Sequence, residues 1–234
     1  DLPFGTVYPR EATGDEPWYW SAWEEPRAGH DYTVFGDVAE GTLADPANER
    51  SGLDSHAGAV LNRRENEFVA SGMGKTIDAD EFGVELRKLA EWYNMAWASP
   101  DMTGGYGSAA IKAFTRSDDT HRPYSRVFQR VKEADSIQEG AEMALWGLKF
   151  TTGNRPHIIT AWLAACRSDP SKRPASRWES SVSVTDPQLV IDERNFIRRK
   201  DGKLEHAVNC HDDMLFAHMG AWWLHLYCPR QTFE

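Results

Sequence analysis

Near its C-terminus the chain reads His211-Asp212-Asp213-Met214-Leu215-Phe216-Ala217-His218-Met219-Gly220. The two adjacent carboxylates open an otherwise apolar segment that continues to Leu226, and we expect this segment to be a buried helix. Ionised side chains at the edge of a buried helix are costly unless they are paired or bind a cation. The doubled aspartate therefore indicates a metal-binding carboxylate cluster, whose other members must come from elsewhere in the chain.

The composition is typical of a soluble globular protein with one large domain. The chain has 234 residues, 41% hydrophobic and 26% charged, which is enough to bury a sizeable core. No apolar run approaches the roughly 20 residues of a membrane span, so we expect no membrane contact. The cysteines, at 166, 210 and 228, lack metal-ligand spacing and are typical of reduced intracellular thiols. The start at Asp1, without a Met or a signal pattern, suits a piece of a longer protein.

The formal net charge of -10 argues at first against a polyanionic partner, because Lys and Arg drive binding to phosphates. The charges are unevenly distributed, however. Acids are concentrated in residues 11–25 and 78–91, whereas basic residues gather in 122–132, 172–177 and 194–203. A local basic surface is therefore compatible with the sequence, although ordinary solvated charge runs would give the same pattern.

Strands and helices alternate along the chain after an initial hairpin, which predicts an α/β fold with a mixed sheet. Residues 1–30 are expected to form an arm, with one strand in its aromatic cluster, that packs on a domain of residues 31–234. The first helix has Asp78 as N-cap and Glu81 at capping-box spacing. The predicted strands cover residues 32–36, 56–61, 67–72, 95–99 and 127–131; the helices cover 78–93, 108–115, 158–166 and 212–226; and loops cover 40–54 and 170–187.

Acids stand at the ends of these predicted elements. Asp37 closes the first strand, Asp101 follows a later one, and Asp212 and Asp213 open the last helix. Functional groups of α/β sheets collect outside the carboxyl ends of strands, so we expect these acids to meet at one edge. Carboxylates gathered there would repel one another unless divalent cations bound them, and hard oxygen ligands suit Mg²⁺ or Mn²⁺. Aspartate is also common at strand ends and helix caps, so spacing alone leaves an ordinary structural role open.

Several short stretches, taken in order, resemble the nuclease domain of the large terminase subunit of tailed bacteriophages. They lie at residues 32–41, 77–82, 92–94, 146–152, 154–156, 192–196, 201–203 and 211–213, and span nearly all of 30–227. The His-Asp-Asp before an apolar helix is the most specific of them. The resemblance implies an RNase H-like mixed β-sheet flanked by α-helices, and an ATPase domain that precedes the nuclease and lies outside this chain.

The resemblance also implies a catalytic site that binds two metal ions. Asp37 would ligate both ions, and Asp101 and Asp213 would complete the set, with Asp212 as the alternative to Asp213. Many relatives have Glu, then Asn and Gly, in the second motif, where this chain has Asp101-Met102-Thr103-Gly104-Gly105-Tyr106-Gly107. The shorter Asp101 still offers a carboxylate, so we expect a retained but reshaped site. Further candidates beside the cluster are His211 and Asp54.

The activity that the resemblance implies is endonucleolytic cleavage of concatemeric viral DNA during genome packaging. One metal would lower the pKa of a bound water to make the nucleophile, and the other would stabilise the leaving oxygen. The candidates for holding the DNA backbone are Arg122, Arg126, Arg130 and Arg155. The implied partners are double-stranded DNA, the terminase ATPase domain, the small terminase subunit and the portal protein, and the implied location is the host cytoplasm during phage assembly.

Two alternatives stay open. Another RNase H-like nuclease, such as a junction resolvase, would use the same acids. A catalytically silent RNase H-like module that grips DNA or docks on the portal would suit the acidic net charge and the departure at Asp101. Nucleotide binding is not expected, because residues 72–76 imitate the end of a phosphate-binding loop but the motif needs a glycine where the chain has Val69.

Overall fold

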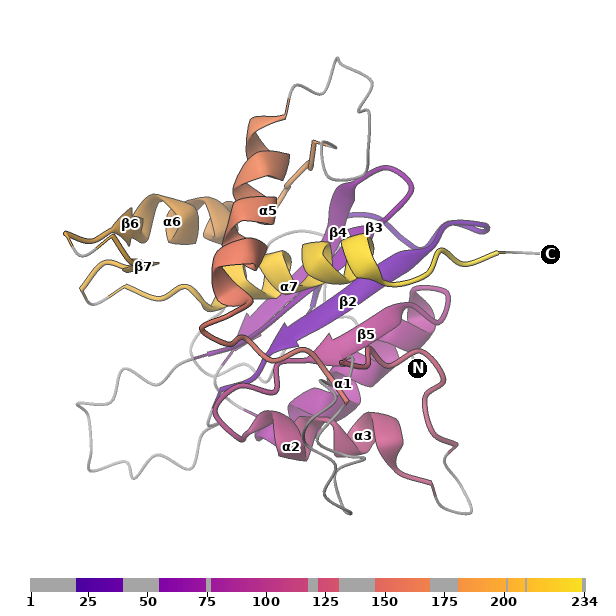
Figure 1. Cartoon of the computed structure of the whole chain (residues 1–234). Coiled ribbons are helices and arrows are strands. Elements are labelled where there is room, and N and C mark those ends of the chain that lie inside the picture. The colour runs from indigo at the N-terminus through magenta and orange to yellow at the C-terminus, as the bar shows by residue number, and fades with distance from the viewer. Residues whose placement is uncertain are drawn as a thin grey trace.

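The computed structural model describes residues 20–39, 55–74, 77–117, 122–130, 146–168, 181–200, 202–208 and 210–232. A five-stranded sheet lies between two layers of helices (Figure 1). In chain order the elements are β1 (Ser21–Ala22), β2 (Tyr32–Asp37), β3 (His56–Asn62), β4 (Glu67–Gly74), α1 (Ala79–Trp92), β5 (Trp97–Pro100), α2 (Gly107–Ala110), α3 (Lys112–Thr115), α5 (Arg155–Arg167), α6 (Pro187–Asn195), β6 (Phe196–Arg198), β7 (Leu204–His206) and α7 (Asp213–Tyr227). None of the helices in these ranges is long and apolar enough to cross a membrane.

The sheet has the strand order β1-β4-β3-β2-β5. β2, β3 and β4 form an antiparallel meander, whereas β5 runs parallel to β2 on its other side. The prediction of an α/β fold with a mixed sheet is therefore confirmed. The parallel pair matters most for function, because the carboxyl ends of β2 and β5 lie at the same edge of the sheet.

Side chains of β2 alternate between two hydrophobic cores. Val34 packs in the core under α1, α2 and α3, and Phe35 packs in the core under α5 and α7. Glycines allow close approach on both faces: a Cβ on Gly36 would lie 2.8 Å from side-chain atoms of α1, and one on Gly220 of α7 would lie 2.2 Å from the Phe35 ring. By the same alternation, Asp37 falls on the face that α7 covers.

α7 crosses that face antiparallel to β2 (Figure 1). The Thr33 hydroxyl donates to the carbonyl of Ala221 at 2.9 Å, so the middle of the helix lies over the first half of the strand. The carboxyl end of α7 reaches Arg63, which also pairs with Asp31 just before β2. The amino end of α7 therefore lies at the other end of β2, next to Asp37.

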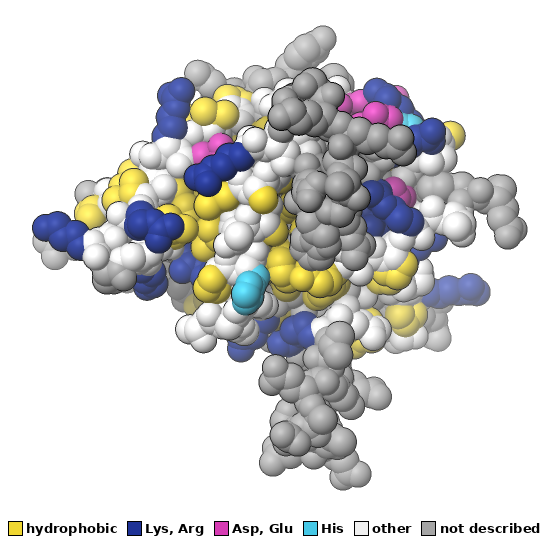
Figure 2. Space-filling view, turned by 45° about the horizontal axis from the view of Figure 1, so that its top comes forward, with side chains coloured by type: hydrophobic (Ala, Val, Ile, Leu, Met, Phe, Trp, Pro, Cys, Tyr) yellow, Lys and Arg dark blue, Asp and Glu magenta, His cyan; other side chains and the backbone are white. Residues whose placement is uncertain are grey.

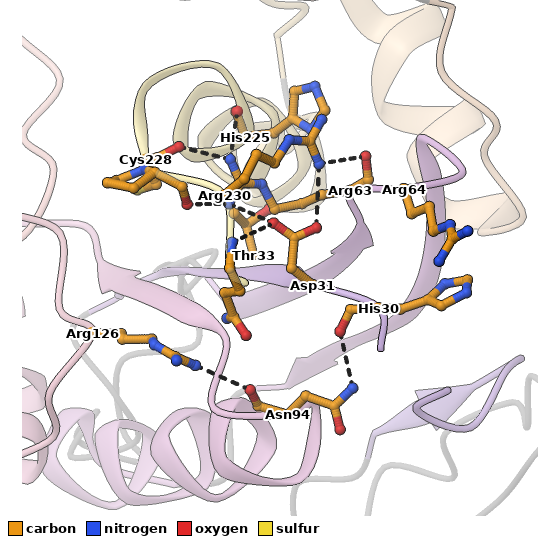
Figure 3. Close-up of polar contacts among 12 residues, drawn as sticks. His30, Asp31, Thr33, Arg63, Arg64, Asn94, Arg126, His225, Cys228 and Arg230 are labelled. Carbon is orange, nitrogen blue, oxygen red and sulfur yellow. Dashed lines mark hydrogen bonds and ion pairs between the residues drawn. The ribbon is translucent and has the colours of Figure 1, made fainter. Parts of the chain in front are cut away.

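Arg63 binds the carboxyl end of α7 from a fully buried position (Figure 3). Its ion pair with the buried Asp31 spans 2.9 Å. Its other contacts are with the carbonyl oxygens of His225 at 3.0 Å, Cys228 at 2.7 Å and Pro229 at 2.7 Å. The last carbonyls of a helix have no intrahelical donor and carry partial negative charge. Arg63 therefore caps α7 and connects it to the β3–β4 hairpin.

Most of the predicted elements are confirmed, and three of the differences concern the middle of the chain. Asp78 is the N-cap of α1, but among the described residues its side chain makes no capping hydrogen bond, so the capping box is wrong. The predicted helix at 108–115 is two short helices separated at Ile111. In its described part, the predicted strand at 127–131 forms only isolated bridges, from Val127 to Ala98 and from Gln129 to Trp146. These bridges extend the sheet beyond β5 without building a full strand.

The remaining differences concern the ends of the chain and the region before α7. The last part of the loop predicted at 170–187 contains a bridge at Ser183 and the first residue of α6. Neither α6 nor the β6–β7 pair was predicted from the sequence. Trp20 is fully buried and β1 pairs with β4, so the chain belongs to the sheet from here on. The loop predicted at 40–54 and most of the predicted arm lie outside the described residues.

His218 is buried in the core beneath α7. Its ring centroid lies 4.3 Å from that of Phe68, and its Nδ1 lies 2.8 Å from the Met214 carbonyl oxygen. Its Nε2 has no hydrogen-bond partner within the described part of the chain. Burial lowers the pKa of His218 below the ordinary 6.5, and the nearby charge of Asp186 opposes this only in part. The unfolded chain therefore takes up a proton more readily than the folded one.

Stability is expected to fall as the pH is lowered through about 6.5, because the unfolded state binds the additional proton first. His218→Gln should reduce this fall by up to about 1.4 kcal/mol per pH unit below the ordinary His pKa, as measured by urea unfolding. Part of the fall should remain, since burial also lowers the pKa of His56. The control is His157→Gln on the exposed side of α5, which should follow the wild-type curve. A His218→Gln curve parallel to the wild type would show that His218 is not buried neutral.

Candidate metal centre

Asp37 ends β2, and Asp101 immediately follows the neighbouring parallel strand β5. Gly36 is in register with Pro100, and the amide of Asp101 donates to the carbonyl of Gly36 at 2.6 Å. Adjacent strands of a sheet are about 4.8 Å apart, and alternate residues share a face. Since Phe35 is in register with Ser99, the residues two positions further on, Asp37 and Asp101, stand side by side on the α7 face of the sheet.

The carboxylate of Asp101 is buried and held by Thr103. The backbone amide of Thr103 donates to Asp101 Oδ1 at 2.8 Å, and its hydroxyl donates to the same oxygen at 2.7 Å. The hydroxyl also accepts from the Phe150 amide at 2.9 Å, which fixes its orientation. Burial raises the pKa of Asp101, and the hydrogen bonds from Thr103 only partly oppose this rise. An adjacent cation would favour the ionised form.

Gly107 brings the turn after Asp101 back against the end of β5. A Cβ at this position would lie 1.9 Å from the carbonyl oxygen of Asp101, so no larger residue fits without moving the backbone. This contact gives a physical reason for a glycine at the end of the second motif. Gly104 and Gly105, which lie between Asp101 and Gly107, have φ of 78° and 103°. At these two positions glycine is favoured by the backbone conformation rather than by a close contact.

Gly107→Ala is expected to destabilise the fold by about 1–3 kcal/mol, because the added methyl must displace backbone at the end of β5. The same displacement should move Asp101 and lower any metal-dependent activity. Urea unfolding measures the first effect. Gly153→Ala is the matched control, because its Cβ would meet only the Thr151 hydroxyl at 3.8 Å. Equal stability of the two variants would contradict the close approach of Gly107 to Asp101.

Asp213 reaches the same edge from α7. It is the first residue of that helix, and its buried carboxylate accepts the Ser55 amide at 3.0 Å through Oδ2. Ser55 immediately precedes β3, in which Ala57 is in register with Asp37. Asp213 therefore joins the two strand-end acids from the helix above them. This arrangement comes from three elements that are distant in the sequence.

The other C-terminal candidates lie beside Asp213. Asp212 is half-buried at the N-cap of α7, and the exposed His211 has its Nδ1 3.9 Å from Asp213 Oδ2. Asp54 lies outside the described residues. The sequence prediction also missed one acid. Asp192 on α6 is buried, and its Oδ2 accepts the Met214 amide at 3.1 Å. The one sequence signal for Asp192 was its position in 192–196, one of the stretches that resemble the terminase nuclease domain.

The donor chemistry at this edge suits a hard divalent cation. Asp37, Asp101 and Asp213 offer carboxylate oxygens only, which Mg²⁺ and Mn²⁺ prefer. Burial of Asp101 and Asp213 makes unbalanced negative charge costly there. As the described residues stand, no three His, Cys, Asp or Glu side chains are gathered closely enough to hold one metal ion. A cation would therefore have to draw the carboxylates together by rotation of their side chains.

The four candidate arginines lie in different places. Arg155 begins α5 with its guanidinium 5.0 Å from the ring of Phe216, in the first turn of α7 and thus near the acids. Arg126 donates to the carbonyls of Asn94 and Met95, at the opposite end of β5 (Figure 3). The carbonyl of Arg122 accepts from Arg87 of α1, on the other side of the sheet. Arg130 is half-buried just past the bridge at Gln129, and desolvation lowers its pKa.

Solved structures with the same fold are known, although no protein-family model and no curated protein matches the sequence. The magnesium-bound large terminase nuclease of thermophilic phage G20c is 15% identical, with a TM-score of 0.57, over 95% of this chain and 93% of that chain. The large terminase nuclease domain of Thermus phage P74-26 is also 15% identical, with a TM-score of 0.51, over 99% and 94%. The G20c nuclease has further been solved with cobalt and with zinc. This chain has the RNase H-like fold of the large terminase nuclease domains, as the resemblance in its sequence implied.

Proposed function

We propose that this chain is a divalent-metal-dependent endodeoxyribonuclease that cuts concatemeric viral DNA during genome packaging. The observation that supports the proposal is the placement of Asp37 and Asp101 at the ends of adjacent parallel strands, with Asp213 hydrogen-bonded to Ser55 at the start of the next strand. The metal-bound G20c nuclease adds support, because its fold is shared over 95% of this chain. We infer Mg²⁺ or Mn²⁺ as the cofactor, with two ions per site.

The three acids would share the proposed site. Asp37, on the strand between β3 and β5, would bind both ions, and Asp101 and Asp213 would complete the ligand set, with Asp212 as the alternative to Asp213. When bound, the cations would supply a nucleophilic water at neutral pH and stabilise charge on the leaving oxygen. The protein itself positions its ligands: Thr103 holds Asp101 through two hydrogen bonds, and Ser55 holds Asp213 through one.

A basic surface next to this edge supports a DNA substrate despite the net charge of -10. α6, β6 and β7 lie at the left of Figure 1, and Figure 2 shows Lys and Arg side chains on that side of the molecule. The exposed residues there are Arg194, Arg198, Arg199, Lys200 and Lys203. Arg199 and Lys203 form ion pairs with Glu205, so Arg155, Arg194, Arg198 and Lys200 are the residues that would hold phosphates without reading the bases. Such binding weakens steeply with salt.

Cleavage of supercoiled plasmid tests the proposal. The purified chain should nick or linearise the plasmid with Mn²⁺ or Mg²⁺ and stop when EDTA is added. Salt-sensitive DNA binding without cleavage, over a wide range of protein concentration and with either ion, would instead favour the catalytically silent module. Preferential cutting of four-way junctions over linear duplex would favour a junction resolvase.

The packaging context is part of the same proposal. We infer that the substrate is double-stranded DNA and that the natural partners are a terminase ATPase domain, the small terminase subunit and the portal protein. The expected location is the host cytoplasm during phage assembly. The arm at 1–30 and the domain at 31–234 remain the predicted division of the chain.

A further inference from the structure

α6 is attached to the sheet at its amino end by a buried carboxylate. Asp186 is the N-cap of this helix, and its Oδ1 accepts the Gln188 amide at 2.7 Å. Its Oδ2 accepts a short hydrogen bond from the hydroxyl of Ser71 in β4. Both side chains are buried. The first turn of α6 is therefore fixed to the sheet and can serve as a support for other groups.

One helical turn further on, α6 presents Asp192 to the amino end of α7. Gln188 donates through Nε2 to Asp192 Oδ1 at 2.8 Å, which orients the carboxylate. Asp192 Oδ2 then accepts the Met214 amide at 3.1 Å, and the Leu215 amide also hydrogen-bonds to Asp192. Three contacts from two helices thus hold one buried side chain.

The amides that Asp192 binds are ones that a helix cannot satisfy by itself. Met214 and Leu215 are the second and third residues of α7, where backbone N–H groups lack an intrahelical acceptor. Within the described residues, the N-cap Asp212 makes no capping hydrogen bond through its side chain. A carboxylate at this end of a helix is also favoured by the helix dipole. Asp192, from α6, therefore accepts a first-turn amide of α7 in place of the side chain of its N-cap residue.

We propose that Asp192 is a positioning residue that fixes the amino end of α7 and thereby orients Asp213 toward Asp37 and Asp101. This inference rests on the proposed role of Asp213 as a metal ligand. Two contacts hold this end of the helix: the Met214 amide, next along the chain, is bound to Asp192, and Asp213 Oδ2 accepts the Ser55 amide. Residues that orient metal ligands in this way commonly change metal affinity by about 10- to 100-fold when removed.

The test compares Asp192→Ala and Asp192→Asn with the wild type in two measurements. The first is hydrogen exchange of the Met214 and Leu215 amides without metal, and the second is Mn²⁺ binding followed by electron paramagnetic resonance. Asp192→Ala should increase the rate of hydrogen exchange at both amides and weaken Mn²⁺ binding by about 10- to 100-fold. Asp192→Asn keeps an acceptor oxygen and should recover most of both. Asp80→Ala, on the exposed surface of α1, controls for the loss of one negative charge.

The outcomes are separable. Unchanged exchange and unchanged Mn²⁺ affinity in Asp192→Ala would overturn the proposal. Equal loss of affinity in the Ala and Asn variants, with normal exchange in Asn, would also overturn it, because Asp192 would then act through its charge on the ion. If the wild type itself binds no Mn²⁺, the proposed function fails, while faster exchange in Asp192→Ala would still support the fixing of α7 by Asp192.

Discussion

The Asp37→Ala variant is expected to lose metal-dependent plasmid cleavage by a factor on the order of 10³ or more, since metal ions contribute several kcal/mol to such reactions. Asp37 ends β2, which pairs with β5 on one side and with β3 on the other. Asp101 follows β5, and Asp213 is hydrogen-bonded to Ser55 at the start of β3. Its removal would leave Asp101 and Asp213 without their shared neighbour. The measurement is the initial rate of nicking with saturating Mn²⁺.

The fold of this variant should be intact. Asp37 is half-buried at the end of β2, so its replacement by alanine should change the melting temperature little. Asp80→Ala removes the same charge from the exposed surface of α1 and should cleave like the wild type. If Asp37→Ala cleaves as fast as Asp80→Ala, Asp37 does not belong to the active site.

Arg63→Met is expected to lower the free energy of unfolding by about 3–5 kcal/mol, the usual cost of breaking a buried ion pair from one side. Methionine fills similar space but donates to none of the carbonyls that end α7. It also leaves Asp31, whose side chain is 7% exposed, with only the half-exposed Arg230 at 3.2 Å as an ion-pair partner in the described structure. Figure 3 shows how these groups converge. Urea unfolding at neutral pH measures the loss.

The neighbouring residue supplies the control for this prediction. Arg64 is exposed, so Arg64→Met should change stability by no more than about 0.5 kcal/mol. Combining Arg63→Met with Asp31→Asn should recover part of the loss, because the uncompensated buried charge is then gone. Equal effects at Arg63 and Arg64 would mean that the capping of α7 by Arg63 contributes nothing to stability.

Elements with strong local patterns were predictable from the sequence. The hairpin of β3 and β4 was recognisable from two β-rich runs around residues 62–66, and α7 from an apolar run that begins at two acids. The prediction that Asp37, Asp101 and Asp213 lie at one edge of the sheet came from a general rule about strand ends rather than from any local signal. Their catalytic and metal-binding roles remain predictions that the plasmid and Mn²⁺ experiments test.

Features set by distant contacts were not predictable. α6 has only a weak apolar stripe, so the sequence pattern does not reveal it. The proposed role of Asp192 depends on its hydrogen bond to Met214 of α7, which lies 22 residues further along the chain. The arginines carry no sequence signal of where they lie, and Arg126 is at the end of β5 remote from Asp101. The strand expected at 127–131 failed for a similar reason, because its partners are short bridges from two different segments.

The parallel pairing of β2 and β5 has a consequence for how such a chain can evolve. Asp37 and Asp101 are separated by one strand spacing, which backbone hydrogen bonds set and side chains do not. The polypeptide between them can therefore gain or lose residues in its connecting segments without altering the gap between the two acids. Variation in length along this part of the sequence is expected to be common among relatives, whereas a one-residue slip of β5 against β2 would turn Asp101 to the opposite face.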